Sequence, residues 1–280
     1  METFRFPSKT FLLGEYAVLQ GSSALLYGHP PLFAVTHESA NEPDCLFHPE
    51  SPAGLWMRQN PVDLKVRLQD PHEGSGGYGG SGAEFLAVWI AQKNVPAPEH
   101  PRAIFAWSAW EDCRAIASSG SGADILTQAF GVNRQEPFFL EIDLEGRSLR
   151  EIFPRPSQGF LSLFHTGKKL ATHEIAKPAP LPVEEMEDMV LRASAALESG
   201  SFPAFARELN AYGEKLASLG LVAPHTAAAL KGIEGRSGIH GAKGCGAMGA
   251  DVILVAHSAQ TDLAGWAREN SLTLTGEFPV

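Results

Sequence analysis

The chain has 280 residues, enough for one large domain or two small ones, and its 44% hydrophobic and 19% charged residues are typical of a globular protein. A formal net charge of −10 argues against a nucleic-acid partner, which requires a basic surface. No apolar run approaches the ~20 residues that cross a bilayer, and the first residues, METFRFPSK, lack a signal-peptide pattern. Cys45, Cys113 and Cys245 are far apart and not spaced as metal ligands. We therefore expect a reduced, cytoplasmic protein without a membrane partner.

The first half of the chain predicts strands followed by helices. Apolar runs broken by Gly and Pro between residues 4 and 35 predict antiparallel strands. Residues 40–72 are polar and poorly periodic, and only residues 64–69 suggest a strand. After a glycine-rich run, the pattern predicts helices over 83–93, 102–117 and 123–131, and then a strand and turn over 137–146.

The second half begins after a segment rich in Pro and Gly at 153–159, which predicts a boundary between domains of residues 1–155 and 156–280. It predicts, in order, a strand (160–167), two or three helices (182–199, 202–220 and 224–234), a glycine-rich loop (238–251), a strand (252–257), a helix (261–270) and a last strand (272–278). Strands and paired helices without regular alternation favour the α+β class, in two halves.

The glycine-rich run, GSGGYGGSGAEF at 74–85, leads directly into a predicted helix. Backbone N–H groups of such a loop and the positive end of the helix can hold phosphate, and Ser81 can cap the helix or help to hold a metal. The alternative is a flexible surface loop with a capping serine. The run lacks the GxxxxGK[ST] pattern of a P-loop.

Three other segments could carry chemistry. Asp124 follows a Gly/Ser turn at the start of a predicted helix, where it is either a general base or an acid favoured by the helix terminus. Glycines at 243–255 let the backbone approach either a ligand or another element. Lys9 lies between apolar residues of a strand, either with a functional partner or guarding a sheet edge.

Taken together, these segments resemble the GHMP kinases, the superfamily of homoserine, mevalonate, phosphomevalonate and galactose kinases. PSKTFLLGEYAVLQG resembles the first family motif, and its GEYAVL is closest to the phosphomevalonate kinase form. GYGGSGAEF is similar to the GLGSSAA phosphate loop, and SSGSGADILTQAFG to the segment with the catalytic aspartate. KGCGAMGADVILV is similar to the third motif, and FLSLFHTGKKLAT to the TG…ST segment of mevalonate-pathway members. The resemblance covers nearly the whole chain.

The resemblance implies a first domain like domain 2 of ribosomal protein S5 and a ferredoxin-like second domain, with ATP and acceptor between them. It implies that Asp124 and Lys9 are catalytic and that Ser81 helps to hold Mg²⁺. The implied ATP-binding residues are Gly77, Gly79, Gly80, Ser81 and Gly82. The implied acceptor-binding residues are Glu15, Tyr16, Lys168, Lys169, Thr172, Gly246, Ala247 and Gly249. Lys243 and Asp251 are in register with the third motif.

The chain departs from the family pattern at several positions. Gly80 and Gly82 stand where serine and alanine are usual, so we expect a more flexible phosphate loop. Met248 replaces a glycine, and its side chain could crowd a ligand. Glu111 and Asp112 lie near the position of the metal-binding glutamate of mevalonate kinases, but its role is not assigned to either. The implied function is an ATP-dependent kinase of the mevalonate pathway, acting on phosphomevalonate as a monomer or homodimer. The alternatives are mevalonate as acceptor, or a nucleotide-binding protein of this fold without activity.

Overall fold

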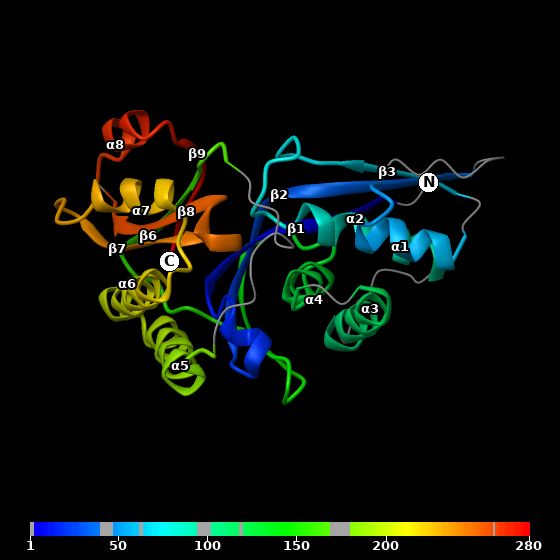
Figure 1. Cartoon of the computed structure of the whole chain (residues 1–280), viewed down its shortest axis with the longest axis horizontal. Coiled ribbons are helices and arrows are strands. Elements are labelled where there is room, and N and C mark those ends of the chain that lie inside the picture. The colour runs from blue at the N-terminus through cyan, green and yellow to red at the C-terminus, as the bar shows by residue number, and fades with distance from the viewer. Residues whose placement is uncertain are drawn as a thin grey trace. The chain divides into compact units, whose positions relative to one another are not determined.

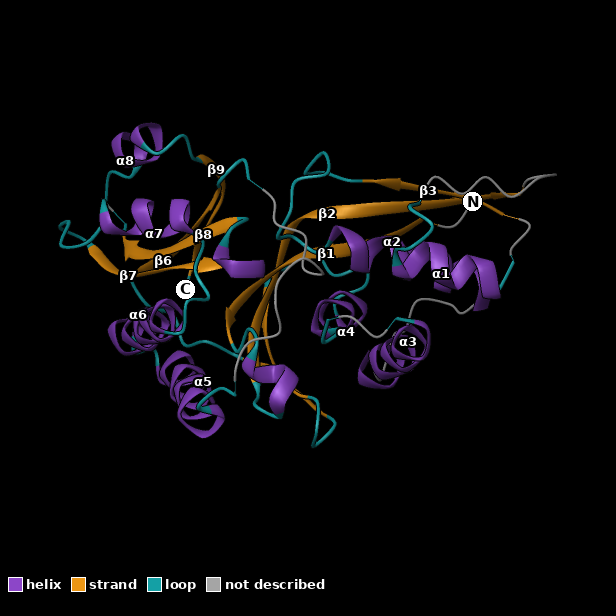
Figure 2. Ribbon diagram, viewed as in Figure 1, coloured by secondary structure: helices purple, strands orange, loops and turns teal. Residues whose placement is uncertain are grey.

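The computed structural model describes residues 3–39, 47–61, 64–93, 102–117, 120–168, 180–259 and 261–280. Helices and strands are mixed along the chain (Figure 2), so the predicted α+β class is confirmed. The chain divides into two compact units. The first comprises residues 1–9, 27–74 and 78–137, and the second comprises residues 10–26, 75–77 and 138–280. The predicted boundary after residue 155 stays a prediction.

The first sheet has the strand order β1-β2-β4-β5, with β3 paired to β2. Its strands are β1 (Thr3–Leu13), β2 (Ala24–Ser39), β3 (Leu64–Gln69), β4 (Phe138–Asp143) and β5 (Ser148–Ile152). β3 runs antiparallel to the end of β2, from Ala34 opposite Gln69 to Ser39 opposite Leu64. A 3-10 turn, η1 (Ala17–Gln20), separates β1 from β2. The predicted strands are therefore confirmed, whereas β5 was not predicted because its alternating SLREI pattern has only one buried residue.

Four helices belong to the first unit: α1 (Pro52–Gln59), α2 (Gly80–Lys93), α3 (Arg102–Ile116) and α4 (Ala123–Phe130). Figure 1 shows them together, and α2 packs against α1 and α4. Most of α2 is buried, including Trp89, which explains its apolar sequence. α1 was not predicted, because residues 40–72 are polar and poorly periodic. Ser51 caps α1 by accepting a hydrogen bond from Gly54 N, and Pro52 occupies the first turn.

The second unit contains a four-stranded antiparallel sheet with the order β7-β8-β6-β9. From residue 159 onward its elements are β6 (Gly159–His165), α5 (Val183–Ser199), α6 (Phe202–Ser218), α7 (Pro224–Lys231), β7 (Ile239–Cys245), the 3-10 turn η3 (Ala247–Gly249), β8 (Val252–Ser258), α8 (Ala264–Glu269) and β9 (Thr273–Pro279). Three helices connect β6 to β7, β8 follows directly, and α8 leads to β9. With the three helices counted as one helical connection, the order is β-α-β-β-α-β, which is the ferredoxin-like pattern that the resemblance implied.

The prediction of a loop over 238–251 was wrong for residues 239–245, which form β7. Glycines usually weaken a strand, but here they allow a helix to pass close to it. A Cβ atom on Gly241 would lie 2.3 Å from Ala206 O on α6, and one on Gly213 of α6 would lie 2.9 Å from Lys243 Cβ. The close approach is therefore to another element, one of the two alternatives that the glycines left open.

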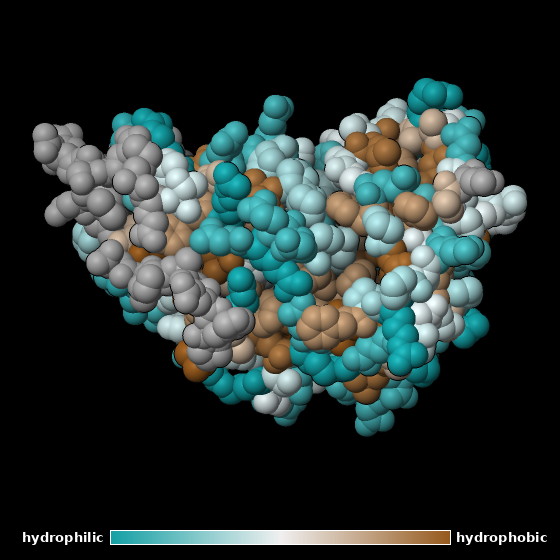
Figure 3. All heavy atoms as spheres, turned by 180° about the vertical axis from the view of Figure 1, so that it is seen from behind, coloured by the Kyte–Doolittle hydropathy of each residue, from teal (hydrophilic) through white to brown (hydrophobic). Residues whose placement is uncertain are grey.

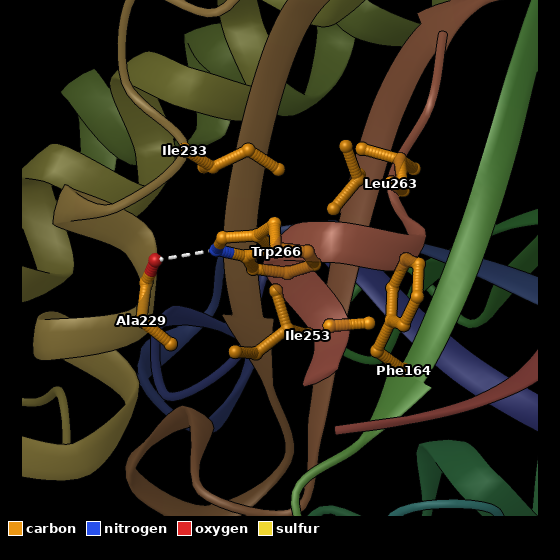
Figure 4. Packing of buried hydrophobic residues seen from close by; sticks show 8 residues of the cluster. Phe164, Ala229, Ile233, Ile253, Leu263 and Trp266 are labelled. Carbon is orange, nitrogen blue, oxygen red and sulfur yellow. Dashed lines mark hydrogen bonds between the residues drawn. The ribbon is translucent and has the colours of Figure 1, made fainter. Parts of the chain in front are cut away.

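A tryptophan forms the centre of a hydrophobic cluster in the second unit (Figure 4). Trp266 of α8 is fully buried, and its indole N–H donates to Ala229 O of α7 over 2.9 Å. Phe164 of β6 meets the indole edge-on at 5.1 Å, and Ile253 of β8 belongs to the same cluster. The hydrogen bond satisfies the single polar group of the indole, so the ring joins two helices to the sheet without a desolvation penalty.

The surface carries large apolar side chains only at scattered positions of the described chain. Figure 3 shows one face, on which apolar residues are interspersed among polar ones. The exposed large hydrophobic residues come from different parts of the chain: Leu19, Ile104, Phe153, Leu191, Leu219 and Leu274. Single exposed hydrophobic residues are normal for globular proteins and identify no binding face.

Candidate functional site

The glycine-rich run ends at the start of α2. Gly77 and Gly79 have φ angles of +91° and +94°, which favour glycine, and the first helical hydrogen bond runs from Ala83 N to Gly79 O over 3.0 Å. A Cβ atom on Gly80 would meet nothing within 4 Å. Ser81 is exposed in the first turn of α2, one residue after the helix begins, so its predicted capping position was wrong. The run is thus a turn into a helix N-terminus beside open space, a geometry that suits an anion.

Lys9 of β1 lies directly against this turn. The residue is 8% exposed, and its backbone N–H donates to Tyr78 O over 3.0 Å. A Cβ atom on Gly79 would lie 3.1 Å from Lys9 Cγ. The lysine side chain therefore passes over Gly79, and the lack of a side chain there makes room for it.

Asp124 is the second residue of α4 and is partly exposed. A Cβ atom on Gly82 would lie 3.2 Å from Asp124 Oδ2, so the carboxylate borders the first turn of α2. The first unit therefore brings Lys9 and Asp124 to the same helix start, at Gly79 and Gly82, two of the glycines that were predicted to hold phosphate. Asp124 also contributes to the environment of Cys113 on α3. Burial raises the pKa of the Cys113 thiol to about 12, and the Asp124 charge adds to this shift.

The turn before Asp124 is fixed by two side chains of α3. The Trp110 indole N–H donates to Ser121 O over 2.8 Å, and Arg114 Nη1 donates to Gly120 O over 2.7 Å. Gly122 then enters α4 with a φ of +73°, and a Cβ atom there would lie 2.7 Å from the Trp110 ring. These contacts of Trp110 and Arg114 fix the turn that orients the carboxylate.

The predicted acceptor residue Glu15 forms a buried ion pair within the second unit. Its carboxylate accepts from the ammonium of Lys243, which is fully buried, and the Glu15 backbone carbonyl accepts from Tyr212 Oη over 2.9 Å. Lys243 Nζ also lies 3.6 Å from Cys245 Sγ. Burial alone lowers the pKa of Lys243, but the charges of Cys245 and Glu15 outweigh it and raise the pKa overall.

Tyr16 and Met248 are joined by a hydrogen bond, and both residues have unusual backbone conformations. Both have positive φ angles, 63° and 55°, which are uncommon for residues with a side chain. Tyr16 Oη accepts from Met248 N over 2.6 Å, and Met248 O accepts from Ala223 N over 2.7 Å. Burial raises the pKa of the Tyr16 hydroxyl, although the bond to Met248 opposes this shift. The backbone of Met248 thus keeps a glycine-like conformation although its side chain is not glycine.

Two glycines, one from each glycine-rich segment, lie against the carboxylate of Asp251. Cβ atoms on Gly76 and Gly246 would lie 2.7 and 2.8 Å from the carboxylate oxygens of Asp251, which is 6% exposed. Gly249 is buried, and its carbonyl accepts from Thr226 Oγ1 over 2.9 Å. These glycines are therefore explained by packing within the second unit, and the assignment of Gly246, Ala247 and Gly249 to the acceptor stays a prediction.

The predicted lysine anchors for the acceptor are described only in part. Lys168 is exposed after β6, where its backbone N–H donates to Thr166 Oγ1 over 3.2 Å. Lys169 and Thr172 lie outside the described residues.

Asp112, near the position of a family metal ligand, has two partners in the fold. Its carboxylate accepts from the Trp89 indole over 2.7 Å and pairs with Lys93 at 2.9 Å. Among the residues that the structure describes, no three His, Cys, Asp or Glu side chains gather as a metal site.

No described helix combines the length and apolar character needed to span a membrane.

Comparison with known proteins gave matches among solved structures only. No family model matches the chain, and no curated protein sequence matches it. The phosphomevalonate kinase of Streptococcus pneumoniae, solved with phosphomevalonate and AMPPNP, is 15% identical at a TM-score of 0.77, with all of both chains covered. The mevalonate kinase of Methanococcus jannaschii is also 15% identical, at a TM-score of 0.67, with 100% of this chain and 98% of that one covered. The galactokinase of Lactococcus lactis is 11% identical at 0.72, with 100% and 95% covered.

These three enzymes belong to the GHMP kinase superfamily, and they match this chain from end to end. Identities of 11–15% carry information about the fold rather than about the substrate. The chain has the GHMP kinase fold.

Proposed function

We propose that this protein is an ATP-dependent small-molecule kinase of the mevalonate pathway, and that it transfers the γ-phosphoryl group of ATP to phosphomevalonate. The observation that carries the proposal is the position of Lys9 and Asp124, which border the N-terminus of α2 at Gly79 and Gly82. A cation, a carboxylate and a helix N-terminus are the groups that phosphoryl transfer needs, because its transition state is stabilised mainly by positioning and charge.

In the proposed reaction an acceptor oxygen forms a bond to the γ-phosphorus while the bond from that phosphorus to the β–γ bridging oxygen breaks, and ADP leaves. Backbone N–H groups from Gly77 to Gly82 hold the phosphates, and Lys9 stabilises the charge on the transferred group. Asp124 accepts the proton when the acceptor is a hydroxyl. When the acceptor is a phosphate, whose second pKa is about 6, little proton is left to remove near neutral pH, and Asp124 orients the acceptor instead.

Ser81 in the first turn of α2 suits a magnesium ion that arrives with the nucleotide. Mg²⁺ takes most of its ligands from phosphates and water and needs only one or two from the protein. The exposed Ser81 hydroxyl would supply one. When bound, Mg²⁺ would neutralise part of the charge on the β- and γ-phosphates.

Phosphomevalonate is favoured as the acceptor by the GEYAVL segment, which resembles the phosphomevalonate kinase form. The S. pneumoniae enzyme has the same fold over the full length of both chains, which agrees with this choice but does not select among acceptors. An anionic acceptor needs local cations in a chain of net charge −10, and the exposed Lys168 is one candidate. The other proposed acceptor residues are Tyr16, Gly246, Ala247 and Gly249.

The test is release of ADP from Mg·ATP with a panel of acceptors: phosphomevalonate, mevalonate, diphosphomevalonate, homoserine and simple sugars. We expect turnover with phosphomevalonate and a loss of about 10²- to 10⁴-fold in Asp124→Ala, with nucleotide binding retained. Turnover with mevalonate alone would replace the acceptor but keep the kinase. Binding of ATP without turnover on any acceptor, in wild type and variant alike, would refute the kinase and favour a binding protein of the same fold.

A further inference from the structure

Gln128 of α4 is a buried polar residue that the proposed mechanism does not use. The residue is fully buried, and its side-chain Nε2 donates to Pro7 O of β1 over 3.1 Å. Its Oε1 atom is buried and has no hydrogen-bond partner among the described residues. Only the NH₂ end of the Gln128 amide can donate to the Pro7 carbonyl, so this hydrogen bond fixes which way the amide points.

The carboxamide of Gln128 lies in contact with both glycines of the candidate site. A Cβ atom on Gly79 would lie 2.9 Å from Gln128 Nε2, and one on Gly82 would lie 2.4 Å from Gln128 Oε1. An Oε1 contact of 2.4 Å is closer than a methyl group can approach, so an alanine at 82 and a glutamine at 128 exclude each other in this conformation. Gly82 is the position where the family usually has alanine.

The same side chain connects the elements that carry the two charged groups. Its bond to Pro7 anchors β1 two residues before Lys9. On α4, Asp124 and Gln128 are four residues apart and so lie on the same side of the helix. The Gln128 amide thus lies where β1, the start of α2 and α4 meet within the first unit.

From these contacts we infer that Gln128 is a positioning residue: its carboxamide occupies the space of an alanine methyl group at position 82 and thereby holds the strand of Lys9 and the helix of Asp124 against the start of α2. Gly82 is then not a sign of a loosened phosphate loop but the counterpart of Gln128. The effect on catalysis rests on the proposed kinase function, whereas the packing of the pair does not.

A double-mutant cycle of Gly82→Ala and Gln128→Ala tests the packing by thermal unfolding. An alanine in place of glycine ordinarily stabilises a helix, so the sign of the change is diagnostic. We expect Gly82→Ala to lower the melting temperature in the wild-type background and to raise it in the Gln128→Ala background, which coupling between contacting residues would produce. Gly265→Ala on α8, where a Cβ atom meets nothing within 4 Å, is the matched control and should act equally in both backgrounds. An equal effect of Gly82→Ala in both backgrounds would overturn the inference.

Gln128→Met tests positioning, because methionine is similar in length but cannot donate to Pro7. We expect kcat to fall by about tenfold or more while the KM for ATP changes by less than about twofold, since a misplaced group costs rate rather than ground-state binding. An unchanged kcat would overturn the positioning role. If wild type has no turnover with any acceptor, the kinase proposal fails and the catalytic role of Gln128 fails with it, whereas the melting cycle still decides the packing of the pair.

Discussion

The two buried lysines beside glycine-rich segments, Lys9 and Lys243, have different surroundings. Lys243 is fully buried, and its charge is matched by the carboxylate of Glu15. Lys9 lies against Gly79, at the start of a helix with open space at Gly80. Its charge also reaches His29, whose pKa it helps to lower. A glycine-rich motif can therefore serve two purposes: in the second unit it allows close packing around paired charges, and in the first unit it leaves room beside a cation.

Among the substitutions that test this difference between the two lysines, Lys243→Met is expected to have the largest effect, a loss of stability. The substitution leaves the Glu15 carboxylate buried without its cation, which we expect to lower the free energy of unfolding by about 3–5 kcal/mol. Denaturant unfolding measures the loss. Adding Glu15→Gln should recover most of it, because the uncompensated charge is then removed. A loss that the second substitution does not reduce would contradict the ion-pair explanation.

Lys9→Met is expected to reduce activity rather than stability. We expect kcat with phosphomevalonate to fall by about 10²- to 10³-fold, the usual cost of removing one charged contact to a transition state. The melting temperature should stay close to that of wild type, because methionine keeps the apolar stem that crosses Gly79. Steady-state kinetics and thermal unfolding of the same samples separate the two effects. A lower melting temperature with unchanged kcat would make Lys9 structural, like Lys243.

A pH effect is expected from His29, which lies in the first unit with Lys9. Burial lowers the pKa of His29 from 6.5 to about 4, and the charges of His72 and Lys9 add to this. Between these two pH values the unfolded chain binds the proton and the folded chain does not, so stability is lost as the pH falls from 6.5 to 4. The shift corresponds to about 3 kcal/mol.

The measurement is the pH dependence of the free energy of unfolding for wild type and His29→Phe. We expect the variant to lose less stability than wild type over this interval, whatever its stability near neutral pH. Parallel curves for the two proteins would show that His29 does not titrate as its burial requires.

The smallest effect is expected at Met248, next to the buried pair. Because its φ is 55°, glycine should be favoured over any residue with a Cβ atom. Comparing Met248→Gly with Met248→Ala removes the methionine side chain from both variants and leaves the backbone preference alone. We expect the glycine variant to be more stable by about 1 kcal/mol in denaturant unfolding. An alanine variant of equal or greater stability would exclude strain at this position.

Hydrophobic periodicity predicted most of the helices and strands, and the sequence resemblance predicted the fold. Two kinds of feature escaped prediction. β7 was missed because its glycines report the approach of α6, a contact that local pattern cannot contain. Gln128 was missed because a glutamine inside a predicted helix looks like a surface residue, and only the position of Pro7, far away in sequence, shows that it is buried. The spacing of four between Asp124 and Gln128 is the one signal in the sequence, because it places both residues on one side of the helix.

The ion pair between Glu15 and Lys243 also sets an order of assembly. The two residues are separated by 228 positions, and the second unit includes residues 10–26 from near the start of the chain. During synthesis this early segment must wait until nearly all of the chain has emerged before its charge is matched. A fragment that begins at residue 156 would carry Lys243 without Glu15, and should therefore fold poorly unless residues 10–26 are supplied as a separate peptide.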